Sequence, residues 1–171
     1  LSLHFRVVCG KTGSGKSRLL AALRAQGAQV LDLEGLANHR GSVLGLVPGS
    51  PQPTQKQFDS RLWDAMRQFD PDRPVWVESE SRKVGELRIP QRLIDCMRAS
   101  PCFHLDLTTD ARVALLMADY DFFVNDVPTF CTRLDALRAL RGNEVINGWQ
   151  EAARSGRIEG VVRELLLTHY D

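Results

Sequence analysis

The chain has 171 residues, of which 43% are hydrophobic and 25% are charged. This composition is typical of an ordinary globular domain that is large enough to bury its own core. Its 22 Lys and Arg residues nearly balance 21 Asp and Glu residues, for a formal net charge of +1, so the overall charge gives no support for a nucleic-acid partner. No apolar run approaches the ~20 residues of a membrane span, and we expect no membrane partner.

Hydrophobic periodicity predicts alternating strands and helices, followed by helices alone. The predicted strands are 4–9, 29–33, 74–78 and 102–107. The predicted helices are 16–26, 54–69, 90–99, 110–120, 127–140, 144–154 and 158–170. A strand, a helix and a strand in succession form a parallel βαβ unit, so the first part of the chain predicts an α/β fold.

Four cysteines occur in the chain, and they form no CxxC pair. No histidine lies near them at the spacing of a zinc site. We therefore expect Cys9, Cys96, Cys102 and Cys131 to be reduced thiols in a cytoplasmic protein.

A glycine-rich segment joins the first predicted strand to the first predicted helix. It reads GKTGSGKS from Gly10 to Ser17 and fits G-x-x-x-x-G-K-[ST] at every required position. Glycines allow successive backbone N–H groups to face an anion at a helix N-terminus. We predict a phosphate-binding loop (P-loop) in which Lys16 reaches the terminal phosphates and the Ser17 hydroxyl binds Mg²⁺. The predicted binding residues are Gly10, Thr12, Gly13, Ser14, Gly15, Lys16 and Ser17.

A magnesium ion at such a loop needs an acidic partner, usually at the end of another strand. Glu78 ends the predicted strand 74–78, and Glu80 follows it. Asp32 and Glu34 follow the second strand. Ligands collect at the carboxyl ends of strands in open α/β sheets, so all four are candidates, and we favour Glu78 as the metal residue.

These features predict a P-loop NTPase-like fold, with a mostly parallel sheet flanked by helices over 1–125 and a helical extension of the same domain over 126–171. The chain has no N-K-x-D motif and no LSGGQ-like signature, which argues against a GTPase and an ABC ATPase. Two other classes stay open. One is a small ATP-dependent kinase whose lid carries Arg82, Lys83, Arg88 and Arg92, and the other is a non-catalytic nucleotide-binding module.

Three further segments narrow the choice. They are LDLEGLANHRGSVLG (31–45), QPTQKQFDSRLW (52–63) and VESESRKVGELRIP (77–90). A long segment between strand and helix, dense in His, Arg, Asn and Gly, is usually functional. Together with the P-loop and the tail ELLLTHYD, these segments closely resemble the P-loop domain of the tRNA 2-selenouridine synthase family over nearly the whole chain.

The resemblance implies a transferase that acts on 2-thiouridine at the wobble position of tRNA anticodons. It implies exchange of sulfur for selenium supplied by selenophosphate, through an S-geranyl intermediate made from geranyl diphosphate. It also implies a rhodanese-like domain with a reactive cysteine ahead of the P-loop domain. We treat this chain as the P-loop half and do not expect the selenation step from it alone.

The resemblance also suggests roles for particular residues. The P-loop would hold geranyl diphosphate, or ATP or GTP, together with Mg²⁺. The candidate catalytic residues are Lys16, His39 and Arg40. The candidate tRNA-binding residues are Arg40, Lys56, Arg82 and Arg88. The candidates for an apolar slot that takes the prenyl chain are Leu36, Val43, Leu44, Phe58 and Trp63.

Overall fold

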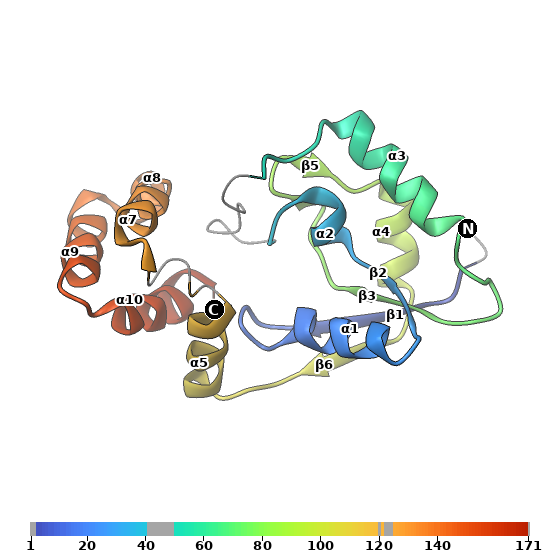
Figure 1. Cartoon of the computed structure of the whole chain (residues 1–171), viewed down its shortest axis with the longest axis horizontal. Coiled ribbons are helices and arrows are strands. Elements are labelled where there is room, and N and C mark those ends of the chain that lie inside the picture. Colours follow the sequence, from blue (N-terminus) through green and yellow to red (C-terminus); the bar gives the residue numbers. More distant parts are fainter. Residues whose placement is uncertain (1–2, 41–49, 120, 122–124, 171) are drawn as a thin grey trace. The chain divides into compact units, whose positions relative to one another are not determined.

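A computed structural model describes residues 3–40, 50–119, 121 and 125–170 (Figure 1). The chain forms two compact units. The α/β unit comprises Leu1–Gly10 and Gly15–Leu105, and the helical unit comprises Lys11–Ser14 and Asp106–Asp171. The C-terminal part of the helical unit thus begins at Asp106, whereas the predicted α/β core extends to residue 125. Among the described residues, no helix is both long and apolar enough to cross a bilayer.

Four parallel strands form the sheet of the α/β unit. They are β1 (Phe5–Gly10), β2 (Gln29–Leu31), β3 (Val75–Glu78) and β6 (Cys102–Leu105), in the order β2-β3-β1-β6. β1 pairs with β3 on one side, with Val7 opposite Val77, and with β6 on the other, with Val7 opposite Cys102. The α/β class with a mostly parallel sheet is confirmed, and the strand that leads into the P-loop lies inside the sheet.

Helices cover the two faces of this sheet unequally. On one face, α1 (Lys16–Ala25) packs Leu20 against Val8 and Val30. The other face carries the larger core, to which α2 (Leu33–Ala37), α3 (Gln55–Met66) and α4 (Gln91–Arg98) contribute Leu33, Phe58 and Leu93. Figure 1 shows α1 and these three helices on opposite sides of the strands.

Helix α3 begins at a capping box formed by Thr54 and Gln57. The Gln57 N–H donates to Thr54 Oγ1 at 3.3 Å, and the Thr54 N–H donates to Gln57 Oε1 at 2.9 Å. Such a capping box gives partners to N–H groups that a helix end leaves unpaired. Phe58 and Leu62, four residues apart, form the buried face, so the predicted helix is confirmed, although it ends at Met66.

Two short elements were not predicted. Helix α2 follows β2 directly, because Asp32 caps it by accepting a hydrogen bond from the Gly35 N–H at 2.8 Å. Strands β4 (Lys83–Val84) and β5 (Leu87–Arg88) form an antiparallel hairpin with Val84 and Leu87 buried. Its turn contains Gly85 at φ +59°, a conformation that glycine adopts most readily.

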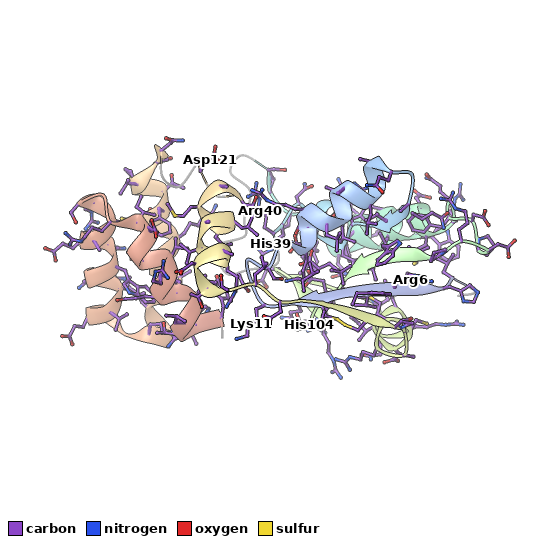
Figure 2. All side chains as sticks on the ribbon, turned by 90° about the horizontal axis from the view of Figure 1, so that it is seen from below. Arg6, Lys11, His39, Arg40, His104 and Asp121 are labelled. Carbon is purple, nitrogen blue, oxygen red and sulfur yellow. A yellow bond between two sulfur atoms is a disulfide. The ribbon has the colours of Figure 1, made fainter. Side chains whose placement is uncertain are left out.

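The edge of the sheet at β6 is exposed and carries a cluster of two rings and a guanidinium. Arg6 lies 5.8 Å from the ring centroids of both Trp76 and Phe103, and the two rings are 5.1 Å apart (Figure 2). A guanidinium over aromatic rings gains a cation–π interaction while its stem covers apolar surface. Arg6 therefore shields the sheet surface beside β6.

The helical unit contains the C-terminal helices. They are α5 (Thr109–Asp119), α7 (Val127–Asp135), α8 (Arg138–Arg141), α9 (Asn143–Arg154), α10 (Ile158–Leu165) and a π-helical turn η1 (Leu166–Tyr170). The predicted helix 127–140 is therefore two helices. The break follows Asp135, where the Arg138 side chain turns back to Asp135 at 2.8 Å and also reaches Asn147 at 2.8 Å. The predicted helical C-terminal part is confirmed.

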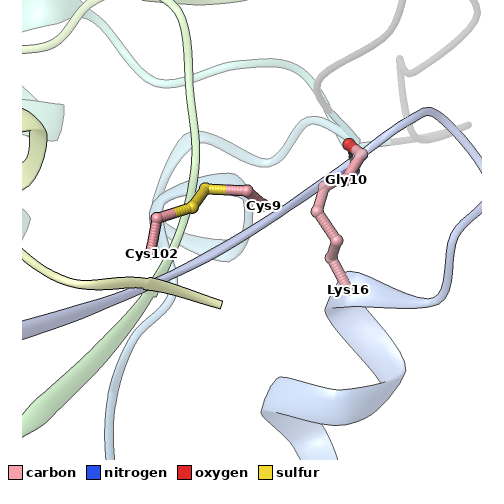
Figure 3. The surroundings of a disulfide bond; sticks show 4 residues. All are labelled: Cys9, Gly10, Lys16 and Cys102. Atoms are coloured by element: carbon pink, nitrogen blue, oxygen red, sulfur yellow. Dashed lines mark hydrogen bonds between the residues drawn. A yellow bond between two sulfur atoms is a disulfide. The ribbon is translucent and has the colours of Figure 1, made fainter. Parts of the chain in front are cut away.

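The expectation of four reduced thiols is wrong for two of the cysteines. Cys9 on β1 and Cys102 on β6 form a disulfide, with Cα atoms 6.2 Å apart and a sequence separation of 93 residues. Parallel pairing of β1 with β6 brings together two residues that are far apart in the sequence. Cys96 and Cys131 are free, as expected. Figure 3 shows the disulfide one residue before Gly10, at the base of the P-loop.

Candidate functional site

The P-loop segment Gly10–Ser17 leaves β1 and enters α1. Gly15 precedes the helix at φ +84°, a backbone conformation that L-residues with a Cβ rarely adopt. Among the described residues no side chain caps this helix, and the N-terminus of a helix is a favourable position for an anion. The Lys16 ammonium donates to the Gly10 carbonyl at 2.9 Å (Figure 3), which holds this cation across the base of the loop.

The apex of the loop is compact. Gly13 has φ +77°, and the Ser14 N–H donates to the Lys11 carbonyl at 3.1 Å. Ser14 is only 4% exposed, and its hydroxyl has no hydrogen-bond partner among the described residues. A buried hydroxyl without a partner costs about 1–3 kcal/mol, so this atom is suited to a ligand that brings an acceptor.

The predicted metal residues Ser17 and Glu78 meet at the start of α1. The Ser17 hydroxyl donates to Glu78 Oε2 at 3.2 Å, and Lys16 Nζ lies 3.6 Å from Glu78 Oε1. Glu78 reaches this position because it is the last residue of β3, next to β1 in the sheet. The structure thus brings together the hydroxyl, the ammonium and the carboxylate that the sequence assigned to one site.

Two more carboxylates join Glu78. One oxygen each of Glu34, Glu78 and Glu80 lie within 4.8 Å of one another. Burial, followed by repulsion from the neighbouring carboxylates, raises the pKa of Glu34 to about 9. The same causes raise the pKa of Glu80 to about 8. Burial also raises the pKa of Glu78, although the Lys16 charge and the Ser17 hydrogen bond oppose the shift.

This group of oxygens fits a hard divalent cation. Carboxylate and hydroxyl oxygens are the ligands that Mg²⁺ takes, and one or two carboxylates plus phosphate oxygens are the usual set. Burial first, and then repulsion between the carboxylates, disfavours the charged forms of Glu34 and Glu80, and a bound cation would oppose both effects. Ser17 and Glu78 are the residues that would hold Mg²⁺, and Glu34 and Glu80 would lie beside it.

The other predicted catalytic residues lie after α2. His39 is 6% exposed, and its backbone N–H donates to the Glu34 carbonyl at 3.0 Å, which ties this segment to the carboxylate cluster. Arg40 is exposed (Figure 2). The predicted segment 31–45 continues into 41–45, which lies outside the described residues.

Three of the four predicted tRNA-binding residues lie around the hairpin. Arg88 on β5 faces Lys83 on β4, and both are exposed. The Ile89 N–H donates to the Arg82 carbonyl at 3.0 Å, and the Gln55 side chain donates to the Arg88 carbonyl at 2.9 Å, which brings Lys56 at the start of α3 close to the hairpin. Arg92 follows the hairpin in the chain and lies in the first turn of α4. We call these residues the basic hairpin surface: Lys56, Arg82, Lys83, Arg88 and Arg92.

The candidates for a prenyl slot do not form one group. Phe58 is fully buried in the core, and Leu36 is partly buried against it. Trp63 is 62% exposed on α3. Val43 and Leu44 lie outside the described residues. The described residues therefore do not define an apolar slot.

One residue of the site was missed in the sequence. Arg112 on α5 is buried, and its Nε–H donates to the Thr12 carbonyl at 2.9 Å. The two residues are 100 positions apart. An arginine in an amphipathic helical pattern is normally expected on the surface, so no local feature of the sequence indicated that Arg112 is buried against the loop.

A parallel sheet whose interior strand runs through a glycine-rich loop into a helix N-terminus defines an α/β protein of the P-loop type. The family model described as "tRNA 2-selenouridine synthase AAA domain" matches residues 3–171. The chain therefore belongs to the tRNA 2-selenouridine synthase AAA-domain family, and the resemblance noted in the sequence is confirmed.

Individual relatives agree with this assignment. The chain is 41% identical over 119 residues to a tRNA 2-selenouridine synthase of Marinobacter nauticus, which covers 68% of this chain and 31% of that protein. It is 32% identical over 168 residues to a tRNA 2-selenouridine synthase of Alcanivorax borkumensis, which covers 96% of this chain and 44% of that protein. The chain thus spans less than half the length of these curated relatives.

Proposed function

We propose that this chain is the part of a tRNA-modifying transferase that binds a magnesium-bound diphosphate, and that the diphosphate belongs to geranyl diphosphate. The main observation in support of this proposal is the arrangement of Lys16, Ser17 and Glu78 at the start of α1. The uncapped N-terminus of this helix and the unpartnered Ser14 hydroxyl support it. The acceptor, 2-thiouridine in tRNA, is inferred from the family.

The loop suits the departing group of an alkyl transfer. When the sulfur of 2-thiouridine attacks the geranyl carbon, the C–O bond breaks and negative charge accumulates on the diphosphate. Fixed donors at that position stabilise the transition state more than the ground state. The Lys16 ammonium and the first N–H groups of α1 would supply them. Mg²⁺, when bound, would add a Lewis acid at the same oxygens.

The basic hairpin surface is the proposed tRNA contact. Lys83 and Arg88 face each other across the hairpin, and like charges in that position destabilise a strand pair. Arg92 places a cation in the first turn of α4, where the helix dipole disfavours it. Cations at positions that are unfavourable for the fold itself are well suited to bind an anionic partner. Because the family modifies tRNA, the proposed partner is the RNA phosphate backbone.

The test is a titration of the full 171-residue chain in Mg²⁺ with geranyl diphosphate, pyrophosphate, ATP and GTP. We expect geranyl diphosphate to bind most tightly. Lys16→Ala should weaken the binding strongly and slow any geranyl transfer to 2-thiouridine tRNA about a hundred- to a thousandfold, the usual effect of losing one charge-stabilising donor. Arg98→Ala, which removes an exposed cation from α4, is the matched control and should bind as the wild type does.

Other outcomes would favour the alternative classes. Preference for ATP with phosphoryl transfer would replace the proposal by a kinase. Nucleotide binding without any turnover would indicate a binding module. A Lys16→Ala protein that binds geranyl diphosphate as the wild type does would contradict the role given to the loop.

A further inference from the structure

Arg112 is an arginine buried inside the helical unit, where a charged side chain is unusual. It lies near the start of α5, is 2% exposed and is the bulkiest of the fully buried side chains among the described residues. Burying a guanidinium is unfavourable unless its N–H groups are well partnered. The hydrogen bonds of Arg112 therefore indicate what the buried guanidinium stabilises.

One of those hydrogen bonds ends on the P-loop. Arg112 Nε–H donates to the Thr12 carbonyl at 2.9 Å, within the helical unit. A charged donor forms a stronger hydrogen bond than a neutral one. The Arg112 backbone is fixed in turn, because its N–H donates to the Thr108 carbonyl at 3.0 Å.

Fixing this carbonyl also fixes the next N–H group. A peptide unit is planar and trans, and no described peptide bond is cis. The Thr12 carbonyl and the Gly13 N–H therefore point in opposite directions from one rigid plane. With the carbonyl turned toward Arg112, the Gly13 N–H is directed away from α5.

Helix α5 also contacts the apex by packing. A Cβ at Gly13 would lie 3.0 Å from Leu116 Cγ and 3.1 Å from the Arg112 carbonyl oxygen. Arg112 and Leu116 are four residues apart and so lie on one face of the helix. This face donates one hydrogen bond to the apex and lies so close to Gly13 that a Cβ there would be crowded.

We propose that Arg112 is a positioning residue of the P-loop: by holding the Thr12 carbonyl, it presets the Gly13 N–H as a donor to the bound diphosphate. The inference rests on the proposed diphosphate function. In this role Arg112 does not contact the ligand. It increases affinity for the diphosphate because the loop then needs no reordering when the ligand binds.

The experiment compares Arg112→Met and Arg112→Lys with wild type, using inorganic pyrophosphate with Mg²⁺ as the probe. Met keeps the apolar stem, and Lys keeps the charge without the planar donor group. We expect both to bind the probe about five- to thirtyfold more weakly, which corresponds to ordering the backbone of about one further residue when the ligand binds. Amide hydrogen exchange in Lys11–Ser14 should be faster in both variants without ligand.

Arg163→Gln is the matched control. Arg163 pairs with Asp110 of the same helix as Arg112 at 2.5 Å and has no contact with the loop among those described. The substitution removes a guanidinium from the helical unit and should leave probe affinity and exchange in Lys11–Ser14 at the wild-type level. If Arg112→Met does not fold, the comparison with wild type uses Arg112→Lys and Leu116→Ala instead. Leu116→Ala shortens the half-buried side chain next to Gly13.

The outcomes separate this inference from the proposed function. A wild-type chain that does not bind pyrophosphate with Mg²⁺ would overturn the proposed function. A wild-type chain that binds, with folded Arg112 variants of equal affinity and unchanged exchange in Lys11–Ser14, would overturn only the role of Arg112. Equal losses in Arg163→Gln would also overturn it, since the effect would then belong to the helix in general.

Discussion

Glu34, Glu78 and Glu80 meet in a space where three negative charges are unfavourable. Lys16 and the Ser17 hydroxyl compensate Glu78. Burial and the neighbouring carboxylates instead raise the pKa values of Glu34 and Glu80, which favours their protonated forms. The cluster can therefore be stabilised in two ways, by protons on Glu34 and Glu80 or by a divalent cation among the oxygens.

This cluster predicts a pH dependence of stability in a chelator, without divalent ions. In the unfolded state both carboxyls have the ordinary pKa of 4.5, whereas in the folded state the pKa of Glu34 is about 9 and that of Glu80 is about 8. Between pH 4.5 and these values the folded state therefore binds protons that the unfolded state has released. The free energy of unfolding should therefore fall as pH rises through this window, by up to about 1.4 kcal/mol per pH unit for each group. Urea denaturation at several pH values measures it.

The matched variants are Glu34→Gln and Glu86→Gln. Glu34→Gln removes one of the protonating groups and relieves the repulsion on Glu78, Glu80 and Asp32, while Lys16 still faces the cluster. It should flatten the pH dependence. Glu86→Gln changes an exposed carboxylate in the hairpin turn and should follow the wild type. Parallel curves for wild type and Glu34→Gln would rule out the explanation.

The facing cations Lys83 and Arg88 weaken the pairing of β4 with β5. Each strand has only two residues, and Val84 and Leu87 provide the buried side. The Gln52 side chain supports the turn by donating to the Val84 carbonyl at 3.0 Å and accepting from the Glu86 N–H at 2.9 Å. The backbone is thus held by Gln52 and Gln55, which leaves the exposed side chains free to serve a partner.

Lys83→Ser with Arg88→Ser should separate binding from stability. Removing two facing cations should leave the free energy of unfolding unchanged or raise it by up to about 1 kcal/mol. Affinity for tRNA should fall, and the slope of log affinity against log salt should decrease by about one for each RNA phosphate that the variant no longer neutralises. Filter binding over a series of KCl concentrations measures both.

An equal change of charge elsewhere is the control for this variant. Arg67→Ser with Arg98→Ser removes two cations from the ends of α3 and α4 and should keep the wild-type salt slope. If both double variants change tRNA affinity equally, the hairpin is not a specific contact and only net charge matters.

The two units differ in charge although the chain is nearly neutral. The α/β unit has 14 Lys and Arg against 10 Asp and Glu, a formal charge of +4, and the helical unit has 8 against 11, a charge of −3. The overall value of +1 therefore conceals a basic unit and an acidic one. A basic unit attracts anionic partners, which is the condition for the tRNA contact proposed at the basic hairpin surface.

The disulfide predicts a loss of stability on reduction. It closes a segment of 93 residues across the α/β unit, and crosslinks of this kind typically stabilise by about 2–4 kcal/mol. Cys102→Ser should lower the free energy of unfolding by that amount in oxidising buffer, and Cys96→Ser, at a free cysteine, should not. Titration of thiols in denaturant without reductant should find Cys96 and Cys131 only. Four reactive thiols would contradict the pairing.

Sequence reasoning succeeded where the signal is local. The strand and helix on either side of Gly10–Ser17, the buried face of α3 and the acidic residue at the end of β3 follow from neighbouring residues. It failed where distant segments meet, as with Arg112 and Thr12, or Cys9 and Cys102. The hairpin was missed for another reason, because two residues per strand show no periodicity.

The pairing of β1 on both of its edges has a consequence for measuring ligands. Ser17 and Glu78 are 61 residues apart and meet only when β1 and β3 are paired, so an unfolded chain has no such site. Any compound held there must therefore delay melting of the folded unit. Each tenfold rise in its concentration above the dissociation constant should add about 1.4 kcal/mol, so a melting curve reports occupancy without a label.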